Sequence, residues 1–463
     1  MVFSGFNFLF LFLPALLIVY YAVPARFAAG RNGVLLLFSL VFYACGGVAF
    51  LPLMLVSSFI NWAGGLLAAP GKAHRKAFFL LTLILDLSLL GWFKYAGFLA
   101  QNLAALGLPV PVPEITLPIG ISFFTFQGMS YLFDVRNGTA PPERSLLRVT
   151  LYIALFPQLI AGPIVRYTDV ADALRSRREN FSDFTDGVLR FLFGLAKKML
   201  LANLLAELAD EVFSGTAALS AASAWLGALA YTAQIYFDFS GYSDMAIGLG
   251  RMFGFRFPEN FNYPYIARSV TEFWRRWHMS LSGWFRDYVY FPLGGSRCSA
   301  ALQLRNLLIV WLLTGLWHGA AWNFVFWGLY FALLLMGERF LWGSALSRAP
   351  RALQHLYALL LVVLSWVLFR ADTLPRALEL FAAMFGAAPL WDIRTEFLLR
   401  QYGPILLIAA VACLPLRPAL EKHLPPSGLL RVWGTPVLAF SLFVLCYVRL
   451  AGSSFNPFIY FRF

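Results

Sequence analysis

The stretch Leu307-Leu-Ile-Val-Trp-Leu-Leu-Thr-Gly-Leu-Trp-His318-Gly-Ala-Ala-Trp322 places one histidine inside a long run of apolar residues. Such a run predicts a helix buried in protein or lipid. Ionisable groups at membrane depth are costly and usually serve a pathway or a reaction. A second histidine, His278, lies 40 positions earlier, in Glu272-Phe-Trp-Arg-Arg-Trp-His-Met-Ser-Leu-Ser282. Because histidine takes and gives a proton near neutral pH, the pair indicates acyl-transfer chemistry.

Composition predicts a membrane location for the whole chain. Of 463 residues, 60% are hydrophobic and 17% aromatic, and only 13% are charged. A soluble domain of this size does not carry so apolar a surface. Apolar runs of about 17 to 25 residues predict helices, since barrel strands show alternating polarity instead. We therefore expect an all-α polytopic membrane protein of roughly 11 transmembrane helices, as a single membrane domain over residues 1–463.

The expected spans are separated by short polar segments. The first, Phe6–Val23, has no basic segment before it and no cleavage site after it, so it is expected to be retained. Residues 115–165 are apolar but broken by Pro and Gly, which indicates either a cavity wall or close helix packing. The spans are placed near 6–24, 33–46, 48–69, 77–98, 225–249, from 307 onward, 353–370, 376–389, 403–416 and 433–452.

The net charge of +13 is concentrated in short loops, as in the positive-inside pattern, and this placement argues against nucleic acid as a partner. Basic residues cluster at 26–31, 72–76 and 166–178, and eight arginines follow between Arg251 and Arg305. These loops are predicted to be cytoplasmic. Counting back one span from Arg26 then puts the N-terminus outside.

Residues 251–305 are too aromatic for a free loop and too charged for a span. The mixture predicts short interfacial or re-entrant helices, where arginines meet phosphates of lipid or of a nucleotide-bearing donor. On one continuous helix, Trp274, His278 and Ser282 would share a face. The candidate substrate-binding residues of this segment are Trp274, Arg275, Arg276 and Ser282.

The segment Tyr236-Phe-Asp-Phe-Ser-Gly-Tyr-Ser-Asp-Met245 carries two carboxylates and two serines in an otherwise apolar run. Such groups must face protein or water rather than lipid. Asp238 and Ser240 are therefore candidate site residues. The alternative is a helix end that is hydrogen-bonded to neighbouring loops.

His318 is the leading catalytic candidate, with His278 as the second. Gly315 and Gly319 thin the helix around His318, and Thr314 and Trp322 are its expected i−4 and i+4 neighbours. The imidazole is thus expected to face a narrow opening lined by aromatic rings, with Trp317 and Asn323 as candidate substrate-binding neighbours. The non-catalytic alternatives are a structural hydrogen bond across helices for His318 and a solvated interface position for His278.

No catalytic role is expected of the remaining histidines or of the cysteines. Three histidines lie near charged or loop residues and are expected to be solvated: His74, His355 and His423. The four cysteines have no metal-ligand spacing, and two histidines without nearby acidic or thiol ligands make a poor metal site. No bound metal or cofactor is expected. A Gly-x-Ser-x-Gly elbow and an H-E-x-x-H motif are also absent from the sequence.

Several segments resemble the signatures of the membrane-bound O-acyltransferases, and of their bacterial alginate O-acetylation branch in particular. The resemblance extends over nearly the whole chain. The matching segments are Pro118–Phe123, Phe156–Pro163, Phe237–Gly248, Pro258–Tyr265, Phe273–Ser282, Leu316–Asn323 and Asn456–Phe463.

The resemblance implies a ring of tilted helices around a thinned centre, with a cytoplasmic funnel that ends at His318 and a second family histidine at His278. It also implies that an acetyl group from a cytoplasmic thioester, acetyl-CoA, crosses the membrane to a periplasmic acetyltransferase. That partner would act within a polysaccharide synthesis and secretion complex on a polymer such as alginate or cellulose.

Three alternatives stay open from the sequence. One is a teichoic-acid D-alanylation protein, which would use the same histidines with a carrier-protein donor. Another is a transporter of acylated lipid without bond chemistry, and the third is a scaffold for a secretion complex. Inverted hydropathy repeats would favour a transporter, and the sequence does not contain them.

Overall fold

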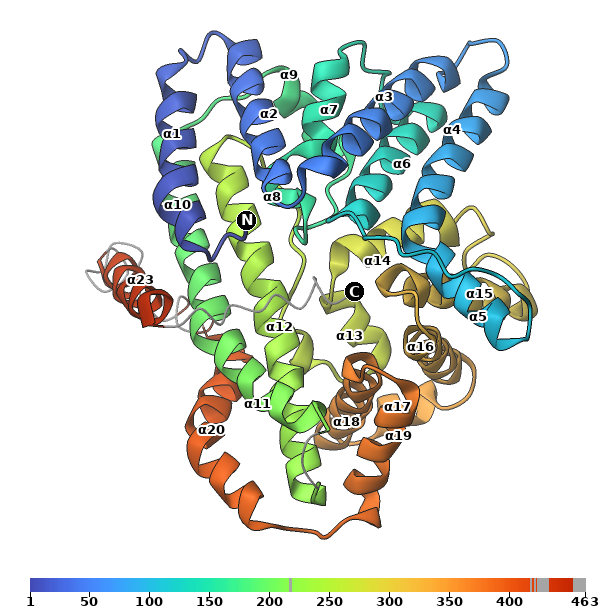
Figure 1. The fold of residues 1–463 in the computed structure, drawn as a ribbon, viewed down its shortest axis with the longest axis vertical. Coiled ribbons are helices and arrows are strands. Elements are labelled where there is room, and N and C mark those ends of the chain that lie inside the picture. Colours follow the sequence, from blue (N-terminus) through green and yellow to red (C-terminus); the bar gives the residue numbers. More distant parts are fainter. Residues whose placement is uncertain (216–218, 417–418, 420–421, 423–432, 453–463) are drawn as a thin grey trace. The chain divides into compact units, whose positions relative to one another are not determined.

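The computed structural model describes residues 1–215, 219–416, 419, 422 and 433–452. Over these residues the chain forms helices and no strands (Figure 1). This confirms the all-α fold class. His423 and the segment Asn456–Phe463 lie outside the described residues.

Five described helical segments are long and apolar enough to cross a membrane, which confirms a multi-pass membrane protein. Four of them coincide with predicted spans, and the fifth carries His318. Predicted spans 6–24 and 33–46 correspond to shorter apolar helices, Phe8–Ala22 and Ala28–Ala44. The count of roughly 11 spans stays a prediction. The five segments are Val48–Ala68, Arg75–Ala105, Ala300–His318, Arg351–Arg370 and Gly434–Gly452.

The chain divides into two compact units, and the helix α12 (Ala221–Met252) contributes residues to both. Unit 1 comprises Met1–Phe191 and Ser243–Pro258. Besides the end of α12, its helices are η1 (Phe8–Phe12), α1 (Leu13–Ala22), α2 (Ala28–Ala44), η2 (Val48–Phe50), α3 (Leu51–Ala68), α4 (Arg75–Leu90), η3 (Gly91–Tyr95), α5 (Ala96–Ala105), α6 (Ile121–Asn137), α7 (Leu146–Ala154), α8 (Phe156–Leu159), α9 (Tyr167–Arg175) and most of α10 (Phe181–Ala196).

Within unit 1, glycines let α3 lie close to its neighbours. A Cβ built on Gly64 would lie 2.3 Å from the hydroxyl of Thr82 in α4, and one on Gly65 would lie 2.4 Å from the Tyr131 ring in α6. Small residues allow such backbone approach in membranes, where lipid gives little hydrophobic drive between helices. Gly64 and Gly65 therefore serve helix packing in this unit.

Unit 2 comprises Leu192–Tyr242 and Glu259–Phe463 and holds all ten candidate site residues. Its described elements are η4 (Lys197–Ala202), α11 (Asn203–Phe213), most of α12, η5 (Pro264–Ile266), α13 (Val270–Arg276), α14 (Met279–Phe285), η6 (Arg286–Tyr290), α15 (Ala300–His318), α16 (Trp322–Phe340), α17 (Gly343–Arg348), α18 (Arg351–Arg370), α19 (Leu374–Ala382), η7 (Ala383–Ala387), α20 (Ile393–Ala412) and α23 (Gly434–Gly452).

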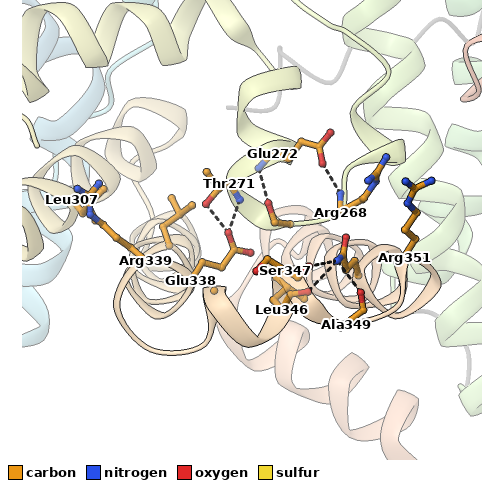
Figure 2. Close-up of a pocket in the computed structure, with 14 residues that line it drawn as sticks. Arg268, Thr271, Glu272, Leu307, Glu338, Arg339, Leu346, Ser347, Ala349 and Arg351 are labelled. Atoms are coloured by element: carbon orange, nitrogen blue, oxygen red, sulfur yellow. Dashed lines mark hydrogen bonds between the residues drawn. The ribbon is translucent and has the colours of Figure 1, made fainter.

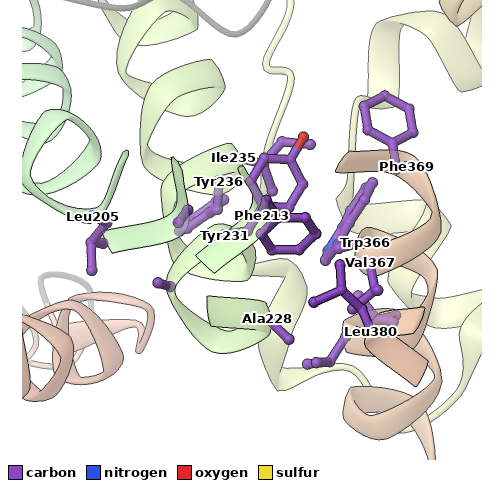
Figure 3. Packing of buried hydrophobic residues seen from close by; sticks show 14 of the residues in the cluster. Leu205, Phe213, Ala228, Tyr231, Ile235, Tyr236, Trp366, Val367, Phe369 and Leu380 are labelled. Atoms are coloured by element: carbon purple, nitrogen blue, oxygen red, sulfur yellow. The ribbon is translucent and has the colours of Figure 1, made fainter. Parts of the chain in front are cut away.

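The core of unit 2 is strongly aromatic. Figure 3 shows Tyr231 and Tyr236 of α12 packing with Trp366 and Phe369 of α18 in one buried cluster. Aromatic rings bury large areas and, at edge-to-face contacts, add roughly 0.5–1.5 kcal/mol per pair. This cluster fixes α18, whose C-terminal half lies beside the candidate site.

The hairpin of α15 and α16 is the tightest helix contact of unit 2. A Cβ built on Gly315 would lie 2.3 Å from the carbonyl oxygen of Phe324, and one on Gly328 would lie 2.3 Å from that of Trp311. No real side chain tolerates such distances to a backbone atom. The two glycines therefore set the spacing of the helices just before His318.

We expect Gly315→Ala to destabilise the protein by roughly 1–3 kcal/mol, because the added methyl group forces the two backbones apart. Thermal unfolding in detergent measures this loss. The matched control is Gly33→Ala in α2, where no heavy atom lies within 4 Å of the added Cβ. Equal unfolding temperatures for the two variants would contradict the proposed role of Gly315.

Candidate active site

His318 is the last residue of α15 and is 9% exposed. Three aromatic rings surround its imidazole, with centroid distances of 5.0 Å to Trp317, 5.1 Å to Trp327 and 5.2 Å to Phe369. All three contacts are edge-to-face. The prediction of an aromatic environment is thus confirmed, with rings contributed by α15, α16 and α18.

The prediction that Trp322 is a helical i+4 neighbour of His318 was wrong. The helix ends at His318, and Gly319 begins an extended connection to α16. Trp322 starts the new helix and is 52% exposed, so it is not an i+4 neighbour of the histidine. His318 therefore lies at the corner of a helix hairpin, where the helix backbone ends, rather than within a continuous helix.

His278 occupies a sharp bend between α13 and α14. Its backbone is left-handed, with φ of 43° and ψ of 52°, a conformation that non-glycine residues adopt rarely and usually where other interactions enforce it. The prediction that Trp274, His278 and Ser282 share one helix face was therefore wrong, because α13 stops at Arg276. The side chain is also buried, at 1% exposure, and is not a solvated interface group.

Asn260, which was not among the predicted site residues, fixes the orientation of the His278 ring. The His278 Nδ1–H donates to the Asn260 side-chain oxygen at 3.0 Å. The same oxygen accepts hydrogen bonds from the backbone N–H and the hydroxyl of Ser280, at 3.3 and 2.8 Å. Because both Ser280 groups donate to it, this Asn260 atom must be the oxygen. Asn260 lies in Pro258–Tyr265, one of the segments that resemble the family signatures, and this is the signal that marks it.

This arrangement leaves His278 with a free lone pair on Nε2. That nitrogen is buried and has no hydrogen-bond partner among the residues that the structure describes. His278 lies outside the candidate spans, and burial lowers the pKa of its imidazole to about 3. The ring is therefore neutral at neutral pH, with its proton on Nδ1 and an accepting Nε2.

Trp317 connects the two histidines. Its indole lies 5.0 Å from the His318 ring and 6.0 Å from the His278 ring, measured between centroids, with an edge-to-face contact in each case. It is 2% exposed. The structure thus brings together three of the predicted site residues: His278, Trp317 and His318.

The other aromatic and basic candidates have separate roles. Trp274 packs against Trp311 and Phe331, at centroid distances of 4.6 and 4.9 Å, and so belongs to the core. Arg276 forms an ion pair with Glu272 at 2.9 Å and donates to the carbonyl of Asn262. Arg275 is exposed, and Ser282 is partly buried, with its hydroxyl 3.5 Å from the Trp274 carbonyl. These contacts do not test the substrate-binding role that is expected of the four residues.

Asp238 forms a buried ion pair with Lys198, at 2.6 Å between Oδ1 and Nζ, with side-chain exposures of 2% and 4%. Lys198 reaches it from the π-helical turn η4, which lies close to α12 because Gly241 has no side chain.

The last two candidates are Asn323 and Ser240. Asn323 donates to the carbonyl of Ala371 at 3.0 Å. Ser240 is buried, and its hydroxyl has no partner in the described part of the chain.

No group of three or more His, Cys, Asp or Glu side chains suited to a metal ion occurs among the described residues. The expectation of no metal site remains a prediction. His278 thus presents an accepting imidazole nitrogen in a buried, aromatic environment, and His318 contacts the same indole. A helical membrane protein with two buried histidines on one indole has elements suited to proton transfer in a membrane acyltransferase.

Residues 73–371 match the membrane-bound O-acyltransferase family, and the chain belongs to that family. It is 42% identical to a probable alginate O-acetylase of Azotobacter vinelandii, over all of both chains. It is 47% identical to that of Pseudomonas aeruginosa, over 83% of this chain and 75% of the relative. A peptidoglycan O-acetyltransferase of Helicobacter pylori is 35% identical, over 82% of this chain and 79% of the relative. The protein is thus an O-acyltransferase.

We expect Asn260→Ala to lower the rate of acyl transfer by roughly 10- to 100-fold, because His278 loses the partner that fixes its tautomer. Asn260→Asp keeps the acceptor but adds a negative charge, which raises the pKa of His278. If His278 must be neutral to assist the transfer, the acid limb of the kcat/KM profile then moves to higher pH. An unchanged pH profile in Asn260→Asp would show that the protonation state of His278 does not control the transfer.

Asp238→Asn should destabilise the fold by about 3–5 kcal/mol, because it leaves the Lys198 ammonium buried without its counter-ion. The double variant Asp238→Leu with Lys198→Met removes both charges and should recover most of this loss. Thermal unfolding of the purified variants measures both effects. Normal unfolding of Asp238→Asn combined with lost acyl transfer would instead assign Asp238 to substrate binding.

Proposed function

We propose that this protein transfers an acetyl group from a cytoplasmic thioester donor, acetyl-CoA, across a bacterial inner membrane for O-acetylation of an exopolysaccharide such as alginate or cellulose. The names of the alginate and peptidoglycan relatives support the acetyl group and the polymer class. The observation that carries the proposal is the free Nε2 of a neutral, buried His278 beside the indole that also contacts His318.

In the proposed reaction, His318 handles the acyl group or acts as the base, and His278 assists it. The acceptor hydroxyl loses its proton to an imidazole while its oxygen attacks the thioester carbonyl. The C–S bond breaks, and the imidazole returns the proton to the leaving thiolate. A positioned general base accelerates such a step by about 100- to 10,000-fold, which suffices for an activated donor such as a thioester.

The proposed topology follows the basic loops, with a periplasmic N-terminus, roughly 11 spans around a thinned centre and a cytoplasmic funnel that leads to His318. Donor and acceptor would then approach the histidine from opposite faces. A periplasmic acetyltransferase within a polysaccharide synthesis and secretion complex would take the acetyl group onward. Transfer of D-alanine from a carrier-protein thioester by the same histidines is the alternative, and family membership favours bond chemistry over transport.

The reaction is tested with His318→Gln in proteoliposomes supplied with radiolabelled acetyl-CoA. Transfer to an added acceptor should fall by at least about 100-fold, because glutamine fills the space but cannot act as a base. The matched control is His74→Gln, an exposed histidine of unit 1. Wild-type transfer by the His318 variant would contradict the catalytic assignment, and label accepted only from a D-alanyl carrier would select the alternative donor.

The topology is tested by cysteine labelling in a background without the native cysteines, since Cys45 is exposed. Ser282→Cys is expected to react with a membrane-impermeant thiol reagent only after the inner face is opened. Val110→Cys is expected to react from outside in intact cells. The reverse pattern would overturn the orientation, and with it the proposed crossing of the acetyl group.

A further inference from the structure

A pocket of about 780 Å³ lies in unit 2, where the end of α16, the short helix α17 and the start of α18 meet the segment before α13 (Figure 2). Its polar lining includes three arginines: Arg268, Arg339 and Arg351. In Figure 2, Arg268 and Arg351 lie toward one end of the pocket and Arg339 toward the other. None of the residues assigned to the candidate active site lines it.

Arg268 and Arg351 are brought to the same part of the pocket by a contact between their segments. His355, one turn after Arg351 on α18, donates from Nδ1 to the carbonyl of Ala267 at 3.2 Å. Ala267 directly precedes Arg268 in the chain. Both arginines are exposed, and over the described residues neither guanidinium makes a hydrogen bond or ion pair. Two cationic forks therefore face solvent from adjoining segments.

The two carboxylates of the pocket, on Glu338 and Glu272, already accept hydrogen bonds from neighbouring groups. Glu338 accepts hydrogen bonds from the backbone N–H groups of Val270 and Thr271, at 2.6 and 2.8 Å, and from the Thr271 hydroxyl at 2.6 Å. Glu272 forms the ion pair with Arg276 and accepts the Arg268 backbone N–H at 2.9 Å. Three arginines against these two glutamates leave the pocket lining with an excess of positive charge. An arginine fork beside such an excess fits a phosphate group.

The surroundings of the pocket are those of a membrane boundary. Arg351 is the first residue of a candidate span, and Leu307 and Leu335 are among the apolar residues that line the pocket. Beyond the pocket on α18, Leu353 and Leu356 are 55% and 60% exposed. Arginines at the end of an apolar helix with an exposed leucine face match a ligand with both a phosphate and acyl chains.

The pocket is too far from His318 to be the site of acyl transfer. Along α18, Arg351 lies roughly 27 Å from Phe369, the residue that contacts His318, at about 1.5 Å per residue. Within the α15–α16 hairpin, the packed rings of Trp311 and Phe331, 5.3 Å apart, lie between the pocket leucines and the histidine. A thioester held at this pocket would therefore lie several helical turns from the His318 imidazole.

We propose that this pocket binds the headgroup of an anionic glycerophospholipid, with Arg268 and Arg351 contacting the phosphate and the acyl chains lying along the exposed leucines of α18. The inference is independent of the proposed reaction. It assigns the pocket a lipid ligand that anchors the ends of α16 and α18 at one membrane surface.

Native mass spectrometry of the full-length protein in neutral detergent, titrated with phosphatidylglycerol or phosphatidylcholine, tests the proposal. The wild type should bind phosphatidylglycerol more tightly. Arg268→Gln with Arg351→Gln should weaken that binding by roughly fivefold per arginine, hence about 25-fold. The control Arg348→Gln removes an exposed arginine that does not line the pocket, and it should keep wild-type affinity.

Competition with inorganic phosphate and with coenzyme A separates the two sources of a phosphate. Neither should displace the lipid at concentrations where phosphatidylglycerol saturates. Displacement by coenzyme A, with loss of coenzyme A binding in the double variant, would assign the pocket to the soluble donor and overturn the lipid proposal. Equal loss in Arg348→Gln, or no preference for phosphatidylglycerol in the wild type, would also overturn it. Arg268→Lys with Arg351→Lys should bind phosphatidylglycerol more tightly than the double glutamine variant, because it keeps the charge but not the guanidinium fork.

Discussion

The close backbone contact of α15 with α16 determines where the chemistry of unit 2 is placed. Gly315 and Gly328 allow each helix to approach a carbonyl oxygen of the other, so the hairpin closes tightly just before His318. The turn then leaves His318 at a helix end, against Trp327 and a ring of α18. A larger residue at either glycine would separate the helices and move the imidazole away from the rings that exclude water from it.

The second histidine depends on a different constraint, the bend at residue 278. The left-handed backbone of His278 ends α13 and starts α14, and it turns the imidazole inward toward Asn260. Asn260 in turn accepts two further hydrogen bonds from Ser280, which anchors it on the start of α14. The strained backbone and the shared oxygen therefore hold one tautomer in place. Strain of this kind is typical of functional sites, where surrounding contacts enforce it.

The sequence predicted the membrane class, the all-α fold and the aromatic setting of His318, because these depend on composition and on apolar runs. It failed where backbone geometry departs from a regular helix. A continuous helix through Trp274 and Ser282 was the simplest interpretation of their spacing. The residues next to His278 include no glycine or proline that would predict a turn there. Similarly, Trp322 follows His318 by four residues yet belongs to the next helix. The ion pair of Asp238 with Lys198 joins residues 40 positions apart and depends on the approach at Gly241, which helix periodicity does not reveal.

The central claim is that His278 and His318 act as one unit through their shared neighbour Trp317. A double-mutant cycle tests it most directly, with kcat/KM for acetyl transfer measured in His278→Ala, His318→Ala and the double variant. Residues that act as a unit are strongly non-additive, so the account predicts that the double variant loses little more than the more damaging single variant. Losses that multiply in the double variant would show that the two histidines act independently and would contradict the account.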